Sequence, residues 1–96
     1  MRIDPQRFGQ ALKRIRKIRG LTQPVLAEES GLTVNYISLV ENGERTVSID
    51  AMNRLAESLE VPARFLSFLG GSGEDGEFAE LTRSTEEAIW AAVEMT

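Results

Sequence analysis

Two runs of apolar residues at helical spacing lie on either side of a break at residues 30–33, Ser-Gly-Leu-Thr, and this break constrains the fold more than any other feature of the sequence. Thr22 can cap the first run as a helix, and Gly31 can supply the left-handed residue that ends it. Thr33 can cap the second run, which ends near Asn42. The chain is therefore expected to contain two short helices joined by a tight turn.

Three more helices are expected in the first 69 residues. Asp4, which is followed by a proline, suits the N-cap of one helix, and Gly20 can end that helix. Ser48 or Asp50 can open a fourth helix, and Pro62 a short fifth one. The inner faces of the second and fourth helices are expected to consist of apolar residues at helical spacing: Val25, Leu26 and Ala27 in the second, and Ile49, Met52, Leu55, Ala56 and Leu59 in the fourth.

The composition of the chain changes after residue 69. Residues 70–77 contain four glycines and no apolar residue, which is typical of a flexible linker. Residues 84–87, Ser-Thr-Glu-Glu, fit a capping box and predict a sixth helix of about ten residues, which needs a surface to pack on. We therefore expect an all-α chain with a five-helix domain at residues 1–69, a linker at 70–77 and an acidic helical tail at 78–96.

The composition excludes several classes of protein. A chain of 96 residues can bury one core, since two independent cores would need more surface. It has no cysteine and no histidine, which removes disulfide frameworks, thiol nucleophiles, the usual zinc sites and histidine catalysis. We expect no cofactor, no metal and no enzymatic activity, because the carboxylates have no matched acid–base partner. No apolar run approaches the roughly 20 residues that span a bilayer, so we expect a cytoplasmic protein without a membrane partner.

The net charge of -4 is divided unevenly along the chain. Residues 1–69 carry ten basic and eight acidic side chains, a net charge of +2, whereas residues 70–96 carry one basic and seven acidic side chains, a net charge of -6. Seven of the basic residues lie among the first twenty positions. This asymmetry favours a polyanion-binding surface and a separate acidic segment. The alternative is a solvated helix face without a partner.

The helix expected after Thr33 has an unusual outer face. On a helical projection Tyr36, Ile37 and Val40 share one side, and the opposite side carries Asn35, Ser38 and Asn42 flanked by Val34 and Leu39. Exposed helix faces are more often rich in Lys, Glu and Gln, which are better helix formers. Asparagine can pair with adenine, serine can bond to any base edge, and valine or leucine can contact a thymine methyl. The face therefore fits readout of the DNA major groove; the alternative is a helix that is merely polar.

Two short helices joined by a turn at Gly31 form the helix-turn-helix arrangement, in which the second helix enters the major groove and the first crosses the DNA backbone. Gln23 at the start of the first of these helices is then placed to hold a phosphate, helped by the free N–H groups of that helix end. The other predicted phosphate contacts are Arg45 and, in the N-terminal helix, Lys13 and Lys17, with Thr22 next to Gln23 at the same helix end. Pro24 removes one of the N–H donors.

Residues 8–66 resemble the phage repressor and Cro-like (XRE) helix-turn-helix domain, a five-helix, lambda-repressor-like fold that binds DNA. The resemblance is carried by Arg16-x-x-x-Gly20-Leu21-Thr22-Gln23, Leu26-Ala27, Gly31, Tyr36-Ile37-Ser38 and Glu41-Asn42-Gly43. It implies base contacts by Thr33, Val34, Asn35, Ser38 and Leu39, and backbone anchoring by Gln23 and Asn42. It also implies a partly buried ion pair between Arg16 and Glu41; the alternative is two solvated charges, which would contribute about 0–1 kcal/mol. Leu39 and Pro24 depart from the family pattern, in which a long polar residue and a donor are common.

A single helix-turn-helix reads only a few base pairs, and dimers place two reading helices about 34–36 Å apart. A surface for self-association is therefore expected. Two apolar clusters are candidates for it, Phe65, Phe68 and Leu69 before the linker and Ile89, Trp90 and Val93 in the tail. The tail could instead fold back on its own domain or bind a different protein. Because its negative charge repels DNA, it should either lie away from the duplex or compete with it.

These features predict a sequence-specific regulator of transcription that binds double-stranded DNA, acting as a homodimeric repressor on a pseudo-palindromic operator. One alternative is an antitoxin or a control protein of a restriction system, whose tail binds a partner protein. Another is a protein-interaction module that does not bind DNA, which Pro24 and Leu39 would permit. A steep dependence of DNA binding on salt, with a selectable base sequence, would distinguish the first hypothesis from the last.

Overall fold

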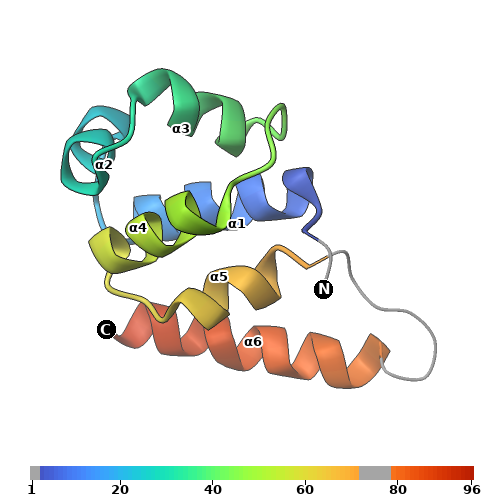
Figure 1. Ribbon diagram of the computed structural model, residues 1–96. Helices are drawn as coiled ribbons and strands as arrows, with labels where there is room; N and C mark the ends of the chain where they lie inside the picture. The colour runs from blue at the N-terminus through green and yellow to red at the C-terminus, as the bar shows by residue number, and fades with distance from the viewer. Residues whose placement is uncertain (1–2, 72–78) are drawn as a thin grey trace.

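The computed structural model describes residues 3–71 and 79–96, and these form an all-α structure (Figure 1). Its helices are α1 (Pro5–Ile18), α2 (Gln23–Ser30), α3 (Val34–Glu41), α4 (Ile49–Leu59), α5 (Ala63–Leu69) and α6 (Ala79–Met95). The predicted fold class, a five-helix domain with an additional C-terminal helix, is confirmed. None of the helices in the described ranges is long and apolar enough to cross a membrane.

The helix boundaries follow the capping residues. Asp4 accepts hydrogen bonds from the main-chain N–H groups of two residues in the first turn of α1, and the side chains of Thr22, Thr33 and Ser48 each cap the N–H group three residues later. The last of these caps shows that α4 begins after Ser48 rather than after Asp50. Gly31 ends α2 with φ at 72°, in the left-handed region that favours glycine. Local hydrogen bonds thus define the starts of the first four helices, whereas α5 begins after Pro62 without a side-chain cap.

The core of the chain lies between these five helices. The side chains that are fully enclosed are Phe8, Leu12 and Ile15 of α1, Leu26 of α2, Ile37 and Val40 of α3, Leu55 and Leu59 of α4, and Leu66 of α5, together with Val93 of α6, which packs against this core. The prediction that Val25 and Ile49 lie on the inner faces of their helices is wrong, because Val25 is 40% exposed and Ile49 is 74% exposed. Val25 lies on the side of α2 away from Leu26, and Ile49 is the first residue of α4, at the edge of its apolar arc.

Helices α1 and α3 are in direct backbone contact at Gly9. A Cβ atom at this position would lie 2.3 Å from the carbonyl oxygen of Val40 and 2.6 Å from that of Glu41. Glycine destabilises the interior of a helix relative to alanine. Its presence in α1 is therefore explained by the close approach of the two helices rather than by helix propensity. This contact positions α3 on α1. Helical periodicity in the sequence did not predict the contact.

The five-helix domain extends to Gly71. The main-chain N–H of Asp4 donates to the carbonyl oxygen of Gly70 at 2.8 Å, and Ile3 and Gly71 form an isolated antiparallel bridge. Both glycines are buried. The first two residues of the predicted linker are therefore part of the packed structure, while the rest of that linker, residues 72–77, lies outside the described residues.

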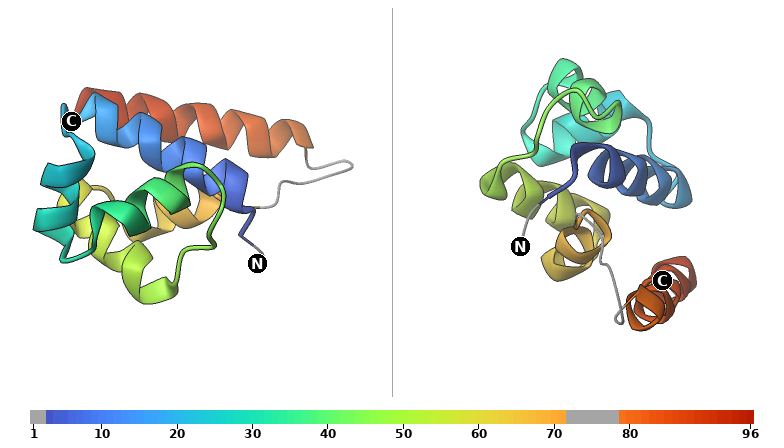
Figure 2. Two further views of the ribbon diagram at one scale, coloured as in Figure 1. Left: turned by 90° about the horizontal axis from the view of Figure 1, so that it is seen from above. Right: turned by 90° about the vertical axis from the view of Figure 1, so that its right-hand side faces the viewer.

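Helix α6 begins at Ala79, five residues before the predicted capping box. The prediction of a capping box is wrong, because residues 84–87 lie inside the helix. The helical turn before them, residues 79–83, contains neither glycine nor proline, so nothing in it stops the helix. The helix lies alongside α1 and α5, on the side of the molecule opposite α3 (Figures 1 and 2). Its Ile89 and Val93 side chains are buried in the common core. In this structure the tail covers its own domain.

Three arginines of α1 and its C-terminal end hold α6 in place. Arg7 forms an ion pair with Glu86 at 3.0 Å, and the guanidinium of Arg14 lies 3.9 Å from the centre of the Trp90 ring. Arg19 donates hydrogen bonds to the carbonyl oxygen of Val93 at the end of α6 and to that of Leu59 at the end of α4. Much of the positive charge near the N-terminus is therefore engaged with the acidic tail.

Candidate nucleic-acid interface

The outer face of α3 presents the residues that were predicted to read DNA. The side chains of Thr33, Val34 and Asn35 are exposed, and those of Ser38 and Leu39 are half-buried. On the opposite side of the helix Ile37 and Val40 are completely enclosed. All five predicted base-contacting residues are therefore at least partly accessible, in contrast to Ile37 and Val40 of the same helix.

Tyr36 organises the loop that follows α3. Its hydroxyl oxygen accepts a hydrogen bond from the main-chain N–H of Ser48 at 3.2 Å, and the guanidinium of Arg45 lies 5.4 Å from the centre of its ring. Cation–π contacts of this kind restrain an exposed arginine without removing its charge. Arg45 is thus held next to the C-terminal end of the reading helix. The sequence placed Tyr36 on the inner side of α3 but gave no sign of these two contacts.

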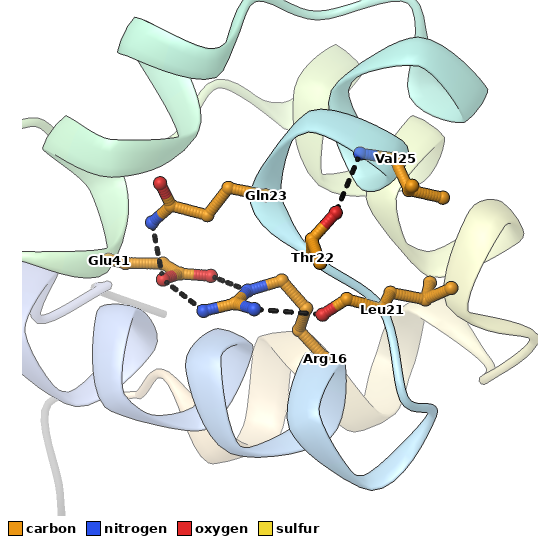
Figure 3. Close-up of polar contacts among 6 residues, drawn as sticks. All are labelled: Arg16, Leu21, Thr22, Gln23, Val25 and Glu41. Atoms are coloured by element: carbon orange, nitrogen blue, oxygen red, sulfur yellow. Dashed lines mark hydrogen bonds and ion pairs between the residues drawn. The ribbon is translucent and has the colours of Figure 1, made fainter.

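Arg16 and Glu41 form a buried, bidentate ion pair (Figure 3). Nε of Arg16 donates to Oε2 of Glu41 at 2.7 Å, and Nη2 donates to Oε1 at 3.1 Å. The side chains are 10% and 2% exposed, respectively. A third donor of Arg16, Nη1, binds the carbonyl oxygen of Leu21 at 2.8 Å. Removing one partner of a buried pair leaves the other charge uncompensated, so this pair matters to stability far more than a solvated pair would.

Gln23 joins this network from the start of α2. Its side-chain Nε2 donates to Oε1 of Glu41 at 2.9 Å, so that the carboxylate accepts hydrogen bonds from both α1 and α2 (Figure 3). Glu41 itself is the last residue of α3. One carboxylate therefore connects the three helices that determine how α2 and α3 are oriented relative to each other. Sequence analysis proposed Gln23 only as a phosphate ligand and did not predict this contact.

The N-terminal end of α2 offers fewer donors than the sequence suggested. Thr22 caps the N–H of Val25, and Pro24 has no N–H. Among the first three residues of the helix, only the main-chain N–H of Gln23 forms no hydrogen bond within the described part of the chain. An anion at this helix end would therefore depend mainly on Gln23, through its main chain and its side-chain amide.

The remaining predicted phosphate contacts are accessible. Lys13 and Lys17 are exposed on α1, Thr22 at the start of α2, and Asn42 and Arg45 after the end of α3. The charges of the lysines and of Arg45 are thus accessible to solvent, as a salt-dependent contact with phosphates requires.

The predicted dimerisation residues fall into two groups. Leu69, Ile89 and Val93 are buried inside the chain, since α6 packs over this part of the core. They form no free surface in this arrangement. Phe65, Phe68 and Trp90 are half-buried and remain partly accessible.

A family model described as "Helix-turn-helix" (HTH_3) matches residues 12–66, which is more than half of the chain and spans α2 and α3 completely. The chain belongs to this helix-turn-helix family. The family that the residues between Arg16 and Gly43 indicated is thereby confirmed.

Similar proteins of this family are named as regulators or control proteins. The HTH-type transcriptional repressor RghR of Bacillus subtilis is 39% identical over 69 residues, covering 71% of this chain and 51% of RghR. The control protein C.BamHI of Bacillus amyloliquefaciens is 38% identical over 63 residues, covering 64% of this chain and 78% of C.BamHI. Among solved structures, the fold is similar to the crystal structure of the restriction-modification controller protein C.AhdI from Aeromonas hydrophila, with a TM-score of 0.64. The two sequences are 41% identical, and the match covers 66% of this chain and 96% of C.AhdI.

The similarity to RghR is partial, since the chain spans about half the length of that repressor. The similarity to C.AhdI covers nearly the whole of the controller protein and about two thirds of this chain.

Proposed function

We propose that this protein is a sequence-specific regulator of transcription that binds double-stranded DNA with α3 in the major groove. The observation that carries the proposal is that Val34 and Asn35 are exposed and Ser38 is partly accessible on α3, while Ile37 and Val40 of the same helix are enclosed in the core. An amide can form paired hydrogen bonds with adenine, a hydroxyl can bond to any base edge, and a valine methyl can contact thymine. Thr33 and Leu39 extend this surface at either end.

The DNA backbone would be held on both sides of α3. Thr22 and Gln23 at the start of α2 lie on one side, and Asn42 and Arg45 after the end of α3 lie on the other. The exposed lysines of α1, Lys13 and Lys17, add positive charge. The acidic helix α6 lies on the side of the molecule away from α3 (Figure 1), so its negative charge would not face a bound duplex.

The active form in this proposal is a homodimer on a pseudo-palindromic operator, since two reading helices about 34–36 Å apart give a specificity that one helix cannot. Phe65, Phe68 and Trp90 are the accessible apolar side chains available for the interface, with Leu69, Ile89 and Val93 supporting them from beneath. A repressor is favoured by the similarity to RghR, which is named as one.

A second candidate function is the control protein of a restriction-modification system. It is favoured by the similarity to C.BamHI and C.AhdI, which are named as a control protein and a restriction-modification controller. Both functions require the same DNA-binding face. They differ in the genes that are controlled and in whether a further protein binds α6.

The proposal is tested by selecting bound duplexes from a random pool and measuring affinity at two salt concentrations. We expect a recurring, two-fold symmetric motif and an affinity that falls steeply with salt. Replacing Asn35 and Ser38 together by alanine should relax the base preference, each lost base contact reducing discrimination by about 1–3 kcal/mol. Glu57→Ala, an exposed change on α4, serves as the control. Selection of no motif by the parent protein, or of the same motif by the double variant, would contradict the assignment.

A further inference from the structure

Glu41 faces Gln23, a residue that the proposed function assigns to a DNA phosphate. We propose that Glu41 is a positioning residue for DNA binding: it orients the side-chain amide of Gln23 so that the amide is preset for a phosphate before DNA arrives. The inference rests on the proposed function and adds a role in binding to two residues, Glu41 and Arg16, that otherwise stabilise the fold.

The hydrogen bond between the two side chains fixes which end of the amide faces which way. An ionised carboxylate only accepts hydrogen bonds, so Nε2 of Gln23, not its oxygen, must point to Oε1 of Glu41, as the 2.9 Å contact requires. One N–H of the amide is used in this bond and the second remains for another acceptor. A free glutamine side chain rotates about three bonds and can present its oxygen to a phosphate, which would repel it. The carboxylate removes that choice.

Glu41 can serve as an anchor because it is itself immobilised. Its side chain is buried, and both of its oxygens accept hydrogen bonds from Arg16. Arg16 also binds the carbonyl oxygen of Leu21, two residues before Gln23. The hydrogen-bond network therefore fixes the position of the Gln23 amide relative to α1, to the segment before α2 and to the end of α3 (Figure 3). Side chains held in this way lose less conformational entropy when they bind.

The shortage of donors at the start of α2 makes this orientation consequential. Pro24 has no N–H, and that of Val25 is occupied by Thr22. A helix end with several free N–H groups would tolerate a misplaced glutamine, because the main chain would still bind the anion. Here the side chain of Gln23 supplies one of the two donors that remain. A change in the orientation of this side chain should therefore change the affinity for DNA measurably.

The test is a double-mutant cycle between Gln23→Met and Glu41→Gln, measured as affinity for a selected operator. Methionine keeps the length of the side chain and removes the amide, and glutamine at 41 keeps the shape but can turn its own amide. We expect Gln23→Met alone to weaken binding about ten- to a hundredfold, the range of one hydrogen bond to a charged group. Glu41→Gln alone should weaken it several-fold. In the Gln23→Met background, Glu41→Gln should change affinity less than about twofold, since the group it positions is gone.

The alternative is that Glu41 acts only by supporting α3. Glu41→Gln would then weaken binding by the same factor in both backgrounds, and the loss would vary with the base sequence of the operator, because α3 would be displaced. That result overturns the inference. A loss that is uniform across operator variants supports it, since phosphate contacts carry no sequence information. Thermal unfolding of all four proteins is followed in parallel, where the effect of Glu41→Gln should persist in both backgrounds.

A second measurement does not depend on the folding of the Glu41 variant. Nuclear magnetic relaxation of the Gln23 side-chain amide in the parent protein should show a rigid group without DNA, in contrast to the exposed Gln6 and Gln10 of α1. An amide of Gln23 as mobile as those two would overturn the inference while leaving the proposed function intact. A parent protein that binds no operator would overturn both.

Discussion

The contact between α1 and α3 at Gly9 allows a prediction whose sign separates two physical effects. Gly9 lies in the first half of α1, where alanine is the better helix former by about 0.5–1 kcal/mol. On helix propensity alone, Gly9→Ala should raise the stability of the protein. The packing of the two helices predicts the reverse.

The magnitude follows from the geometry. A Cβ atom at position 9 would lie 2.3 Å from the carbonyl oxygen of Val40, whereas real Cβ atoms essentially never approach another heavy atom closer than 3.0 Å. The two backbones must therefore separate by at least about 0.7 Å, the difference of those distances. Overpacking of this kind costs about 1–3 kcal/mol, and neither backbone can rotate away as a side chain could. With about 4–8 °C lost per kcal/mol in a domain of this size, Tm should fall by roughly 5–20 °C.

The assay is thermal unfolding followed by circular dichroism, with Gly20→Ala as the control. Gly20 has φ at 73° and nothing within 4 Å of its added Cβ, so alanine there tests backbone strain without a steric clash, at a cost of about 1 kcal/mol. We also expect Gly9→Ala, but not Gly20→Ala, to weaken DNA binding, because only the former displaces α3. A variant Gly9→Ala that unfolds at or above the Tm of the parent would refute the account of helix packing.

Other perturbations test other parts of the structure. Arg16→Met should reduce the free energy of unfolding in urea by about 3–5 kcal/mol, since it leaves the carboxylate of Glu41 buried without its cation; a loss below 1 kcal/mol would mean that the pair behaves as a solvated one. Val93→Ala should destabilise the docking of α6 by about 2 kcal/mol, from two lost methyl groups and the cavity they leave. Hydrogen exchange should then increase in α6 and not in α3, and equal increases in both helices would contradict independent docking. Lys17→Ala should lower the slope of log affinity against log salt by about 0.9 without changing the selected motif, and an unchanged slope would exclude a phosphate contact there.

Much of the fold could be predicted from the sequence because its signals are local. Thr22, Thr33 and Ser48 cap helices through their own neighbouring N–H groups, and Gly31 ends α2 through its own backbone conformation. The polar outer face of α3 follows from helical periodicity in the same way. These properties depend on residues within one or two turns of each other, so the order of residues is sufficient to place them.

The errors occurred where a residue's environment depends on another helix. Val25 and Ile49 are apolar and occur at helical spacing, yet the helices of the described ranges leave 40% and 74% of these residues exposed. The start of α6 was placed too late because the motif at residues 84–87 was interpreted as a capping box, while the helix continues N-terminally to Ala79. Neither the Gly9 contact nor the hydrogen bond of Gln23 to Glu41 has a local signal, since the partners are separated by 31 and 18 residues.

The amino-acid order by itself determined the first five helices, most of their ends and the chemistry of the outer surface of α3, because hydrogen-bonding caps and side-chain periodicity act over a few residues. Only the tertiary structure decided what the charges do. Arg7, Arg14 and Arg19 belong to the same basic segment as Lys13 and Lys17, yet the arginines contact α6 while the lysines remain exposed. Electrostatic and packing partners are chosen by proximity in space, and that proximity exists only once the helices have packed around a common core.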